Sequence, residues 1–358
     1  MMESDNVSSL PPSPSSPAEP ILVGISFILF TSSFFVPYVY AMFWMMRDRN
    51  LARKSFQRIM IALGFVDLLQ LLVNGYVGSA FMIARATPPF WINKVLGGLL
   101  NTSFIIHSSL ATLLAFNRFV VMCLRQEFRQ SIFSRSKTDW MILLCYLYGG
   151  CFLVAYLCPE VDVLLQSDVY SWHYSTTQES TTFCYIELVQ DFSQVVIMIV
   201  FYTAVVIKMK MLVANMSTAA FVVGQRGATV ASREIGVSIQ AALVSTVVIV
   251  GLIIWFTAPQ LAANRWSFLS ANALWLATAG TQAWIYFVFN KRLRRHALYY
   301  ACPFWKNSGG APLDGDESTF TSSNYGAQKN KRTLALMGYG AACMIGRPYA
   351  PQEADTVA

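Results

Sequence analysis

A carboxylate and an imidazole lie at a similar depth inside two long apolar stretches. Asp67 lies in "ALGFVDLLQLLVNG", and His107 precedes Arg118 by eleven residues. With a rise of 1.5 Å per helical residue, Asp67 and His107 lie about 12 and about 16 Å from the basic ends of their stretches, and Gln282 lies about 12 Å from its own. An Asp–His pair titrates near neutral pH, so it would make contacts between helices sensitive to protonation. The alternative is that the three side chains do not interact and that each forms a hydrogen bond with a backbone carbonyl. Glu187 lies just before another stretch.

The chain is too apolar for a soluble protein. It is 55% hydrophobic and 13% charged, where soluble domains have about 25% charged residues. Basic residues form short clusters between apolar runs, which indicates orientation in a bilayer and not nucleic-acid binding. Most runs reach the roughly 20 residues that a membrane-crossing helix needs. We therefore predict an all-α membrane protein, a bundle of seven transmembrane helices over residues 21–46, 59–83, 95–123, 140–157, 188–207, 235–264 and 266–290.

Charge distribution predicts the orientation of this bundle. Of the 26 Lys and Arg residues, 23 lie in alternate loops and the C-terminal region on one side. Loops rich in Lys and Arg face the cytosol, so the C-terminus is expected there and the N-terminus outside. The predicted parts are an extracellular disordered tail (1–20), the bundle (21–290), an amphipathic juxtamembrane helix contacting lipid (291–302) and a cytosolic disordered tail (303–358).

Several residues outside the spans are candidates for modification. Asn6 stands in a glycosylation sequon. Cys158 and Cys184 fall in the long outer loop, where they form a disulfide or remain free thiols. Cys302 is either palmitoylated or a free thiol. The acidic stretch "DGDESTFTSSNYG" is either a plain linker or a phosphorylated segment, with Ser318, Thr319, Thr321, Ser322 and Ser323 as acceptors.

Four features together resemble rhodopsin-type G-protein-coupled receptors. They are an Asp in the second span, "LAFNRF" ending the third, a Tyr in "VIMIVFYTAVVIKMK" in the fifth and "TQAWIYFVFNKRLRR" ending the seventh. Together with "REIGVSIQAALV" in the sixth span, these segments are similar to those of nematode serpentine chemoreceptors of the T or X class. The likeness covers residues 21–302. It implies a plasma-membrane chemosensory receptor that activates a heterotrimeric G protein and meets an arrestin-like regulator, with no cofactor.

The resemblance implies roles for individual residues. Arg118 would reach toward Tyr202 and the G protein, with Tyr286 as the partner switch. The full set of implied switch residues is Asp67, His107, Asn117, Arg118, Tyr202, Glu234, Gln282 and Tyr286.

The sequence also departs from the family pattern. Asn117 supplies no carboxylate to restrain Arg118, which leaves Glu234 as a restraint and predicts appreciable basal activity. Ala283 replaces the proline that kinks the seventh span. The chain has no Cys before Cys123, so the usual disulfide from the third span cannot form.

The outer halves of the third, fifth, sixth and seventh spans predict a ligand site. Aromatic and apolar groups dominate its wall, which favours a small, mostly uncharged ligand, or a peptide. No acid lies at ligand depth in the third span, so a protonated amine would lack the expected counter-ion. Ordinary helix packing is the alternative for its wall, which is predicted to include Leu100, Asn101, Phe104, Trp255, Phe268, Asn272 and Trp275.

A transporter or channel is the alternative function, although the spans show neither internal repeats nor a ring of charge. An enzyme or metal site is not expected, because His107, His173 and His296 are dispersed along the chain.

Overall fold

The structure is a computed structural model. It describes residues 16, 18–47, 54–166, 168–219, 224–261, 265–289 and 293–294, leaving aside the side chains of 213–219, 224–234 and 258–261. In this part of the chain the long elements are helices, in the order α1 (Glu19–Arg47), α2 (Ser55–Gln70), η1 (Leu71–Gly78), α3 (Ser79–Ala84), α4 (Phe90–Cys123), α5 (Gln126–Ile132), α6 (Arg135–Leu157), α7 (Gln178–Ala219), α8 (Gly224–Leu261) and α9 (Arg265–Phe289).

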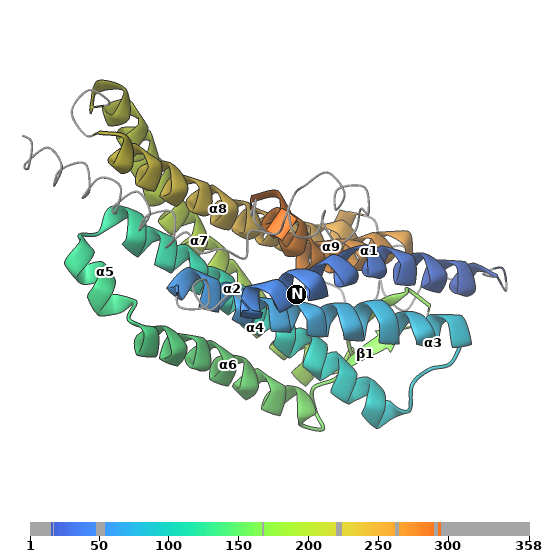
Figure 1. Cartoon of the computed structure of the whole chain (residues 1–358). Coiled ribbons are helices and arrows are strands. Elements are labelled where there is room, and N and C mark those ends of the chain that lie inside the picture. Colours follow the sequence, from blue (N-terminus) through green and yellow to red (C-terminus); the bar gives the residue numbers. More distant parts are fainter. Residues whose placement is uncertain are drawn as a thin grey trace, which may run out of the picture. The chain divides into compact units, whose positions relative to one another are not determined.

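Six helical segments are long and apolar enough to cross a membrane, with α2, η1 and α3 forming one continuous span. α9 completes the bundle as the seventh helix and packs against α8 and α1. Its polar residues lower its hydropathy, but Asn272, Thr278 and Gln282 are all buried inside the protein. The seven-helix bundle predicted from the apolar runs is confirmed (Figure 1).

Several helices begin before the residues predicted for their spans. α6 begins at Arg135 and α7 at Gln178, five and ten residues before the predicted starts at 140 and 188. Both extensions carry polar residues that a search for apolar runs excludes. As a result, Cys184 and Glu187 lie within α7 and not in the loop before it.

The middle helix α4 organises the bundle. It packs against α2, α6, α7 and α8, and its buried face includes Leu100, Leu110 and Leu114. Gly149 of α6 lies close enough to α4 that a Cβ there would meet Ile106 Cγ1 at 2.2 Å. A small residue thus permits the close approach of these two helices.

Two short strands form a hairpin between α6 and α7. β1 (Val163–Gln166) pairs antiparallel with β2 (Ser171–Tyr174), with Val163 opposite Tyr174. The hairpin lies at one end of the bundle, and α5 lies at the other (Figure 1). These are called the hairpin end and the Arg118 end, because Arg118 lies in the last turns of α4, just before α5.

Candidate functional site

Arg118 is buried at its end of the bundle among neighbours from α4 and α2. Its side chain is only 3% exposed. Nη2 donates to Oδ1 of Asn117 at 2.5 Å, and the guanidinium carbon lies 4.6 Å from the centre of the Phe56 ring. Asn117 in turn donates from Nδ2 to Ser55 Oγ at 3.0 Å, so these contacts join α4 to the start of α2.

Two tyrosines from other helices are held at the same end. Tyr202 of α7 accepts a hydrogen bond from Ser245 Oγ of α8 at 3.1 Å, and it lies within electrostatic reach of Arg118. Tyr286 of α9 accepts a hydrogen bond from Gln57 Nε2 of α2 at 3.0 Å. Each tyrosine therefore ties two helices together.

A buried polar cluster lies in the middle of the bundle. His107 Nδ1 is 2.5 Å from Asp67 Oδ1, and the Tyr38 hydroxyl donates to Asp67 Oδ2. The three side chains come from α4, α2 and α1, and each is at most 1% exposed. The Asp67–His107 pairing inferred from depth is present, and Tyr38 is a third member that the sequence argument did not include.

Gln282 does not join this cluster, contrary to the expectation of a three-residue group. Its Nε2 donates to Met60 Sδ at 3.7 Å, and Met60 lies seven residues, about two helical turns, before Asp67 in α2. Gln282 therefore lies nearer the Arg118 end than Asp67 does.

At the hairpin end, amide side chains connect the hairpin to the bundle. Asn74 of η1 donates to Asn272 Oδ1 at 2.7 Å and accepts from Trp172 Nε1 at 3.2 Å. Asn272 Nδ2 donates to the Tyr170 carbonyl at 3.1 Å. Asn74 lies in a π-helical turn, a feature that is frequent at functional sites.

The structure brings some of the predicted ligand-site residues together. The Trp275 ring lies 5.5 Å from Phe104 and 4.8 Å from Trp255, edge to face in both pairs. Trp275 Nε1 also donates to Gln70 Oε1 at 2.6 Å. Leu100 is wholly buried in the apolar core.

The remaining predicted residues have partners in other parts of the hairpin end. Phe268 packs against His173 of the hairpin, with ring centres 4.6 Å apart. Asn101 donates to Glu187 of α7 and to the Tyr174 hydroxyl, both at 3.3 Å. The amide and indole groups of the predicted ligand site therefore already hold helices and hairpin together.

The predicted disulfide between Cys158 and Cys184 is wrong, because both are free thiols in the structure. Cys184 lies in the second turn of α7, where the helix fixes its direction. Cys158 Sγ donates to the Val154 carbonyl of its own helix at 3.4 Å.

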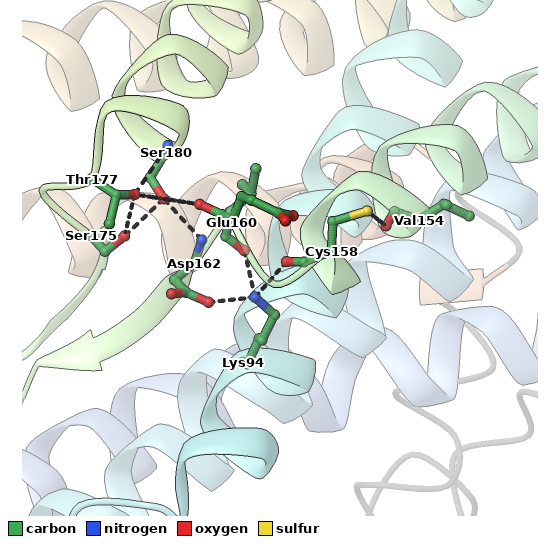
Figure 2. Close-up of polar contacts among 9 residues, drawn as sticks. Lys94, Val154, Cys158, Glu160, Asp162, Ser175, Thr177 and Ser180 are labelled. Atoms are coloured by element: carbon green, nitrogen blue, oxygen red, sulfur yellow. Dashed lines mark hydrogen bonds and ion pairs between the residues drawn. The ribbon is translucent and has the colours of Figure 1, made fainter.

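Lys94 of α4 holds the loop instead. Figure 2 shows its ammonium group between the loop carbonyls and Asp162. Nζ donates to the carbonyls of Cys158 at 2.7 Å and Val161 at 2.9 Å, and it forms an ion pair with Asp162. The neighbouring Asn93 pairs with both backbone groups of Leu165, donating to its carbonyl at 3.3 Å and accepting from its N–H at 2.8 Å.

Two acidic residues of α7 are buried, and neither was predicted as a site residue. The Glu187 carboxylate accepts hydrogen bonds from Tyr174, Tyr156 and Asn101. Asp191 was overlooked, although it lies inside the predicted span 188–207, and it is only 1% exposed. The spacing of Glu187, Gln190, Asp191 and Gln194 is the signal that could have identified this buried polar face.

His173, in the hairpin, makes the fold sensitive to acid. Burial lowers its pKa from 6.5 to about 4, and Nε2 has no hydrogen-bond partner in the described part of the chain. The folded protein therefore favours the neutral ring, while the unfolded chain takes up a proton as the pH falls below 6.5. Stability from this residue is complete above pH 6.5 and is lost progressively down to about pH 4.

Replacing this histidine should remove that sensitivity. The variant His173→Phe keeps an aromatic ring against Phe268. As the pH falls from 7.5 to 5, we expect its free energy of unfolding to rise by about 1–2 kcal/mol relative to that of the wild type. Melting temperatures of the detergent-solubilised protein at the two pH values measure the difference. An equal change with pH in both proteins would contradict this prediction.

Other predicted sites fall outside the described residues or side chains. These are the sequon Asn6, the thiol Cys302, the side chain of Glu234, the amphipathic helix over 291–302 apart from residues 293–294, and the hydroxyls Ser318, Thr319, Thr321, Ser322 and Ser323.

Comparison with known families decides the identity. The sequence model described as serpentine type 7TM GPCR chemoreceptor Srx matches residues 30–290. The chain belongs to this family. It is therefore a multi-pass membrane protein and a G-protein-coupled chemosensory receptor, with a ligand and a G protein as partners.

The fold of this receptor is similar to that of squid rhodopsin. The crystal structure of squid rhodopsin matches with a TM-score of 0.71 at 13% sequence identity, over 87% of the receptor and 92% of the rhodopsin chain. No curated protein matches the sequence. The prediction of a rhodopsin-like serpentine chemoreceptor is confirmed, and the transporter alternative finds no support.

Proposed function

We propose that the receptor lies in the plasma membrane with the hairpin end outside and the Arg118 end in the cytosol. The bias of Lys and Arg toward the loops at the Arg118 end supports this orientation. It makes 1–20 an extracellular tail and 303–358 a cytosolic one, with 291–302 along the inner leaflet, and it would place an arrestin-like regulator at the cytosolic tail.

In this proposal the ligand binds beneath the hairpin and shifts the population of helix arrangements at the Arg118 end. The observation that carries the proposal is the buried position of Arg118, near Tyr202, while Tyr286 at the same end ties α9 to α2. Sliding of α7 or α9 past α4 would change the surroundings of the guanidinium, and a G protein could then contact it.

Removing this guanidinium tests the function. We expect Arg118→Ala to abolish GDP–GTP exchange on the G protein, because no other described residue replaces its position. Arg125→Ala, at an exposed arginine just beyond α4, is the matched control and should leave exchange unchanged. Exchange is measured in membranes with equal surface expression of receptor. Equal loss in both variants, or none in either, would refute the proposed role of Arg118.

The asparagine before Arg118 should set the basal activity. Asn117→Asp keeps the oxygen that accepts from Arg118 and turns a hydrogen bond between a charged and a neutral group into an ion pair, which strengthens it. In the wild type Ser55 Oγ accepts a hydrogen bond from Asn117 Nδ2, and in the variant the Ser55 hydroxyl can rotate and donate to the new carboxylate. We expect ligand-free exchange to fall about tenfold. Unchanged ligand-free exchange at equal surface expression would show that Asn117 does not weaken the hold on Arg118.

A further inference from the structure

One face of α7 carries four polar residues at helical spacing. Glu187, Gln190, Asp191 and Gln194 follow one another at intervals of three, one and three residues, which places them on one side of the helix. Glu187, Gln190 and Asp191 are 7%, 8% and 1% exposed, so this side faces the inside of the bundle.

Both ends of this polar face are paired with α4. At the outer end, Asn101 donates to Glu187 at 3.3 Å. At the inner end, Gln194 donates to Ser109 Oγ at 3.1 Å and accepts from Thr112 Oγ1 at 3.4 Å. Asn101 and Glu187, and Ser109 and Gln194, are separated by nearly the same number of residues in the chain. α4 and α7 therefore run side by side past Gln190 and Asp191, which lie between these two contacts.

The middle of the face has no partners. Both carboxylate oxygens of Asp191 and both amide atoms of Gln190 lack hydrogen bonds to any described residue. Glu187 differs from Asp191, because three hydrogen-bond donors stabilise its negative charge. A buried carboxylate without donors is strongly unfavourable unless a positive group pairs with it.

Aromatic rings of α6 and α7 lie beside this position. Tyr148 of α6 is within electrostatic reach of Asp191. Its ring centre lies 5.3 Å from that of Phe152, which lies 5.7 Å from Phe183 of α7. Aromatic faces attract cations, and they would favour a ligand with a flat apolar part next to its charge.

We propose that Asp191, assisted by Gln190 and Glu187, binds the protonated amine of the receptor's ligand at the junction of α4, α6 and α7. This assignment rests on the proposed receptor function and names the ligand class for it. An ammonium group has three donors, which match the Asp191 carboxylate, the Gln190 side-chain carbonyl and the free lone pairs of Glu187. The Gln190 amide nitrogen remains to donate to an acceptor near the amine.

The acids of α7 change the class of ligand that was predicted from the sequence. A protonated amine was not expected, because the third span lacks an acid at ligand depth. The counter-charge lies on the fifth span instead, with Asp191 opposite the α4 residues between Asn101 and Ser109. A divalent metal ion fits less well, because no group of three His, Cys, Asp or Glu residues in the described part of the chain could hold one.

Binding of simple amines tests the site without requiring the natural ligand or a G protein. The probes are protonated amines from methylammonium to 2-phenylethylammonium, each compared with its neutral alcohol of similar shape. We expect the amines to raise the melting temperature of the purified receptor and the alcohols to leave it unchanged. Asp191→Asn should weaken amine binding by at least about tenfold. Glu127→Gln, at an exposed carboxylate of α5, is the charge-matched control and should bind the amines as the wild type does.

Three results would overturn the assignment. One is the absence of any amine effect on wild-type receptor, which means that Asp191 is held neutral by a proton. The second is equal stabilisation by sodium chloride and by the amines, which means an inorganic cation site. The third is an unchanged amine effect in Asp191→Asn. Amine binding measured this way is separate from Arg118-dependent exchange, so intact exchange with no amine binding refutes this site alone. Amine binding without exchange refutes the proposed function alone.

Discussion

Replacing His107 by leucine is expected to destabilise the receptor by about 3–5 kcal/mol, because it removes the imidazole partner of the buried Asp67 carboxylate. The substitution leaves the Asp67 carboxylate with the Tyr38 hydroxyl alone, inside a bundle where both side chains are at most 1% exposed. Little His107→Leu receptor should then reach the cell surface, and its melting temperature in detergent should be much lower than that of the wild type.

Removing the charge as well should restore most of the stability. Asp67→Asn keeps an oxygen that accepts from Tyr38 and has no charge to bury. The double variant Asp67→Asn/His107→Leu is therefore expected to be more stable than His107→Leu, so the two effects are not additive. A double variant as unstable as the sum of the single changes would show that the pair is not coupled.

The double variant also tests whether the pair senses pH. The hydroxyls of Tyr38 and Tyr146 lie nearest to the pair. We expect the pH profile of GDP–GTP exchange to flatten in the folded double variant. An unchanged profile would remove the pair as a pH sensor.

The bundle could be predicted from sequence because its cause is local. In the membrane the backbone of a segment must form its hydrogen bonds within the segment, which a helix does. Each long apolar run therefore indicates one helical span. The hairpin was not foreseen, because strands of four residues inside a polar loop leave no apolar run. The π-helical turn Leu71–Gly78 was not foreseen either, since α and π turns have the same composition.

Pairs between helices were predictable only in part. The rise per residue gives depth only from a known helix end. Asp67 and His107 could be matched, but α2 begins at Ser55 and not at 59, so Gln282 was wrongly added to them. The prediction of a disulfide was wrong because it placed Cys184 in the loop, whereas α7 begins at Gln178 and includes Cys184. Asp191 could have been predicted from the spacing of the polar residues of α7, which repeat on one side of the helix.

The second large effect is expected at Lys94, which holds the hairpin in place of a disulfide. Its ammonium group is wholly buried and contacts two loop carbonyls and Asp162. Lys94→Met keeps the apolar stem but leaves these three groups without their donor. We expect a loss of about 3 kcal/mol in the free energy of unfolding, because one partner of a buried ion pair is removed. Melting temperature of the purified receptor measures it.

Two controls separate the ammonium contacts from other causes. Lys137→Met makes the same change at an exposed lysine and should alter stability by no more than about 0.5 kcal/mol. Dithiothreitol should leave the melting temperature of the wild type unchanged, because Cys158 and Cys184 are free. A fall in melting temperature on reduction, together with a mild effect of Lys94→Met, would mean that a disulfide holds the hairpin. Asp162→Asn also removes one partner of this ion pair and leaves the wholly buried ammonium without its counter-charge, so it should lower stability as well.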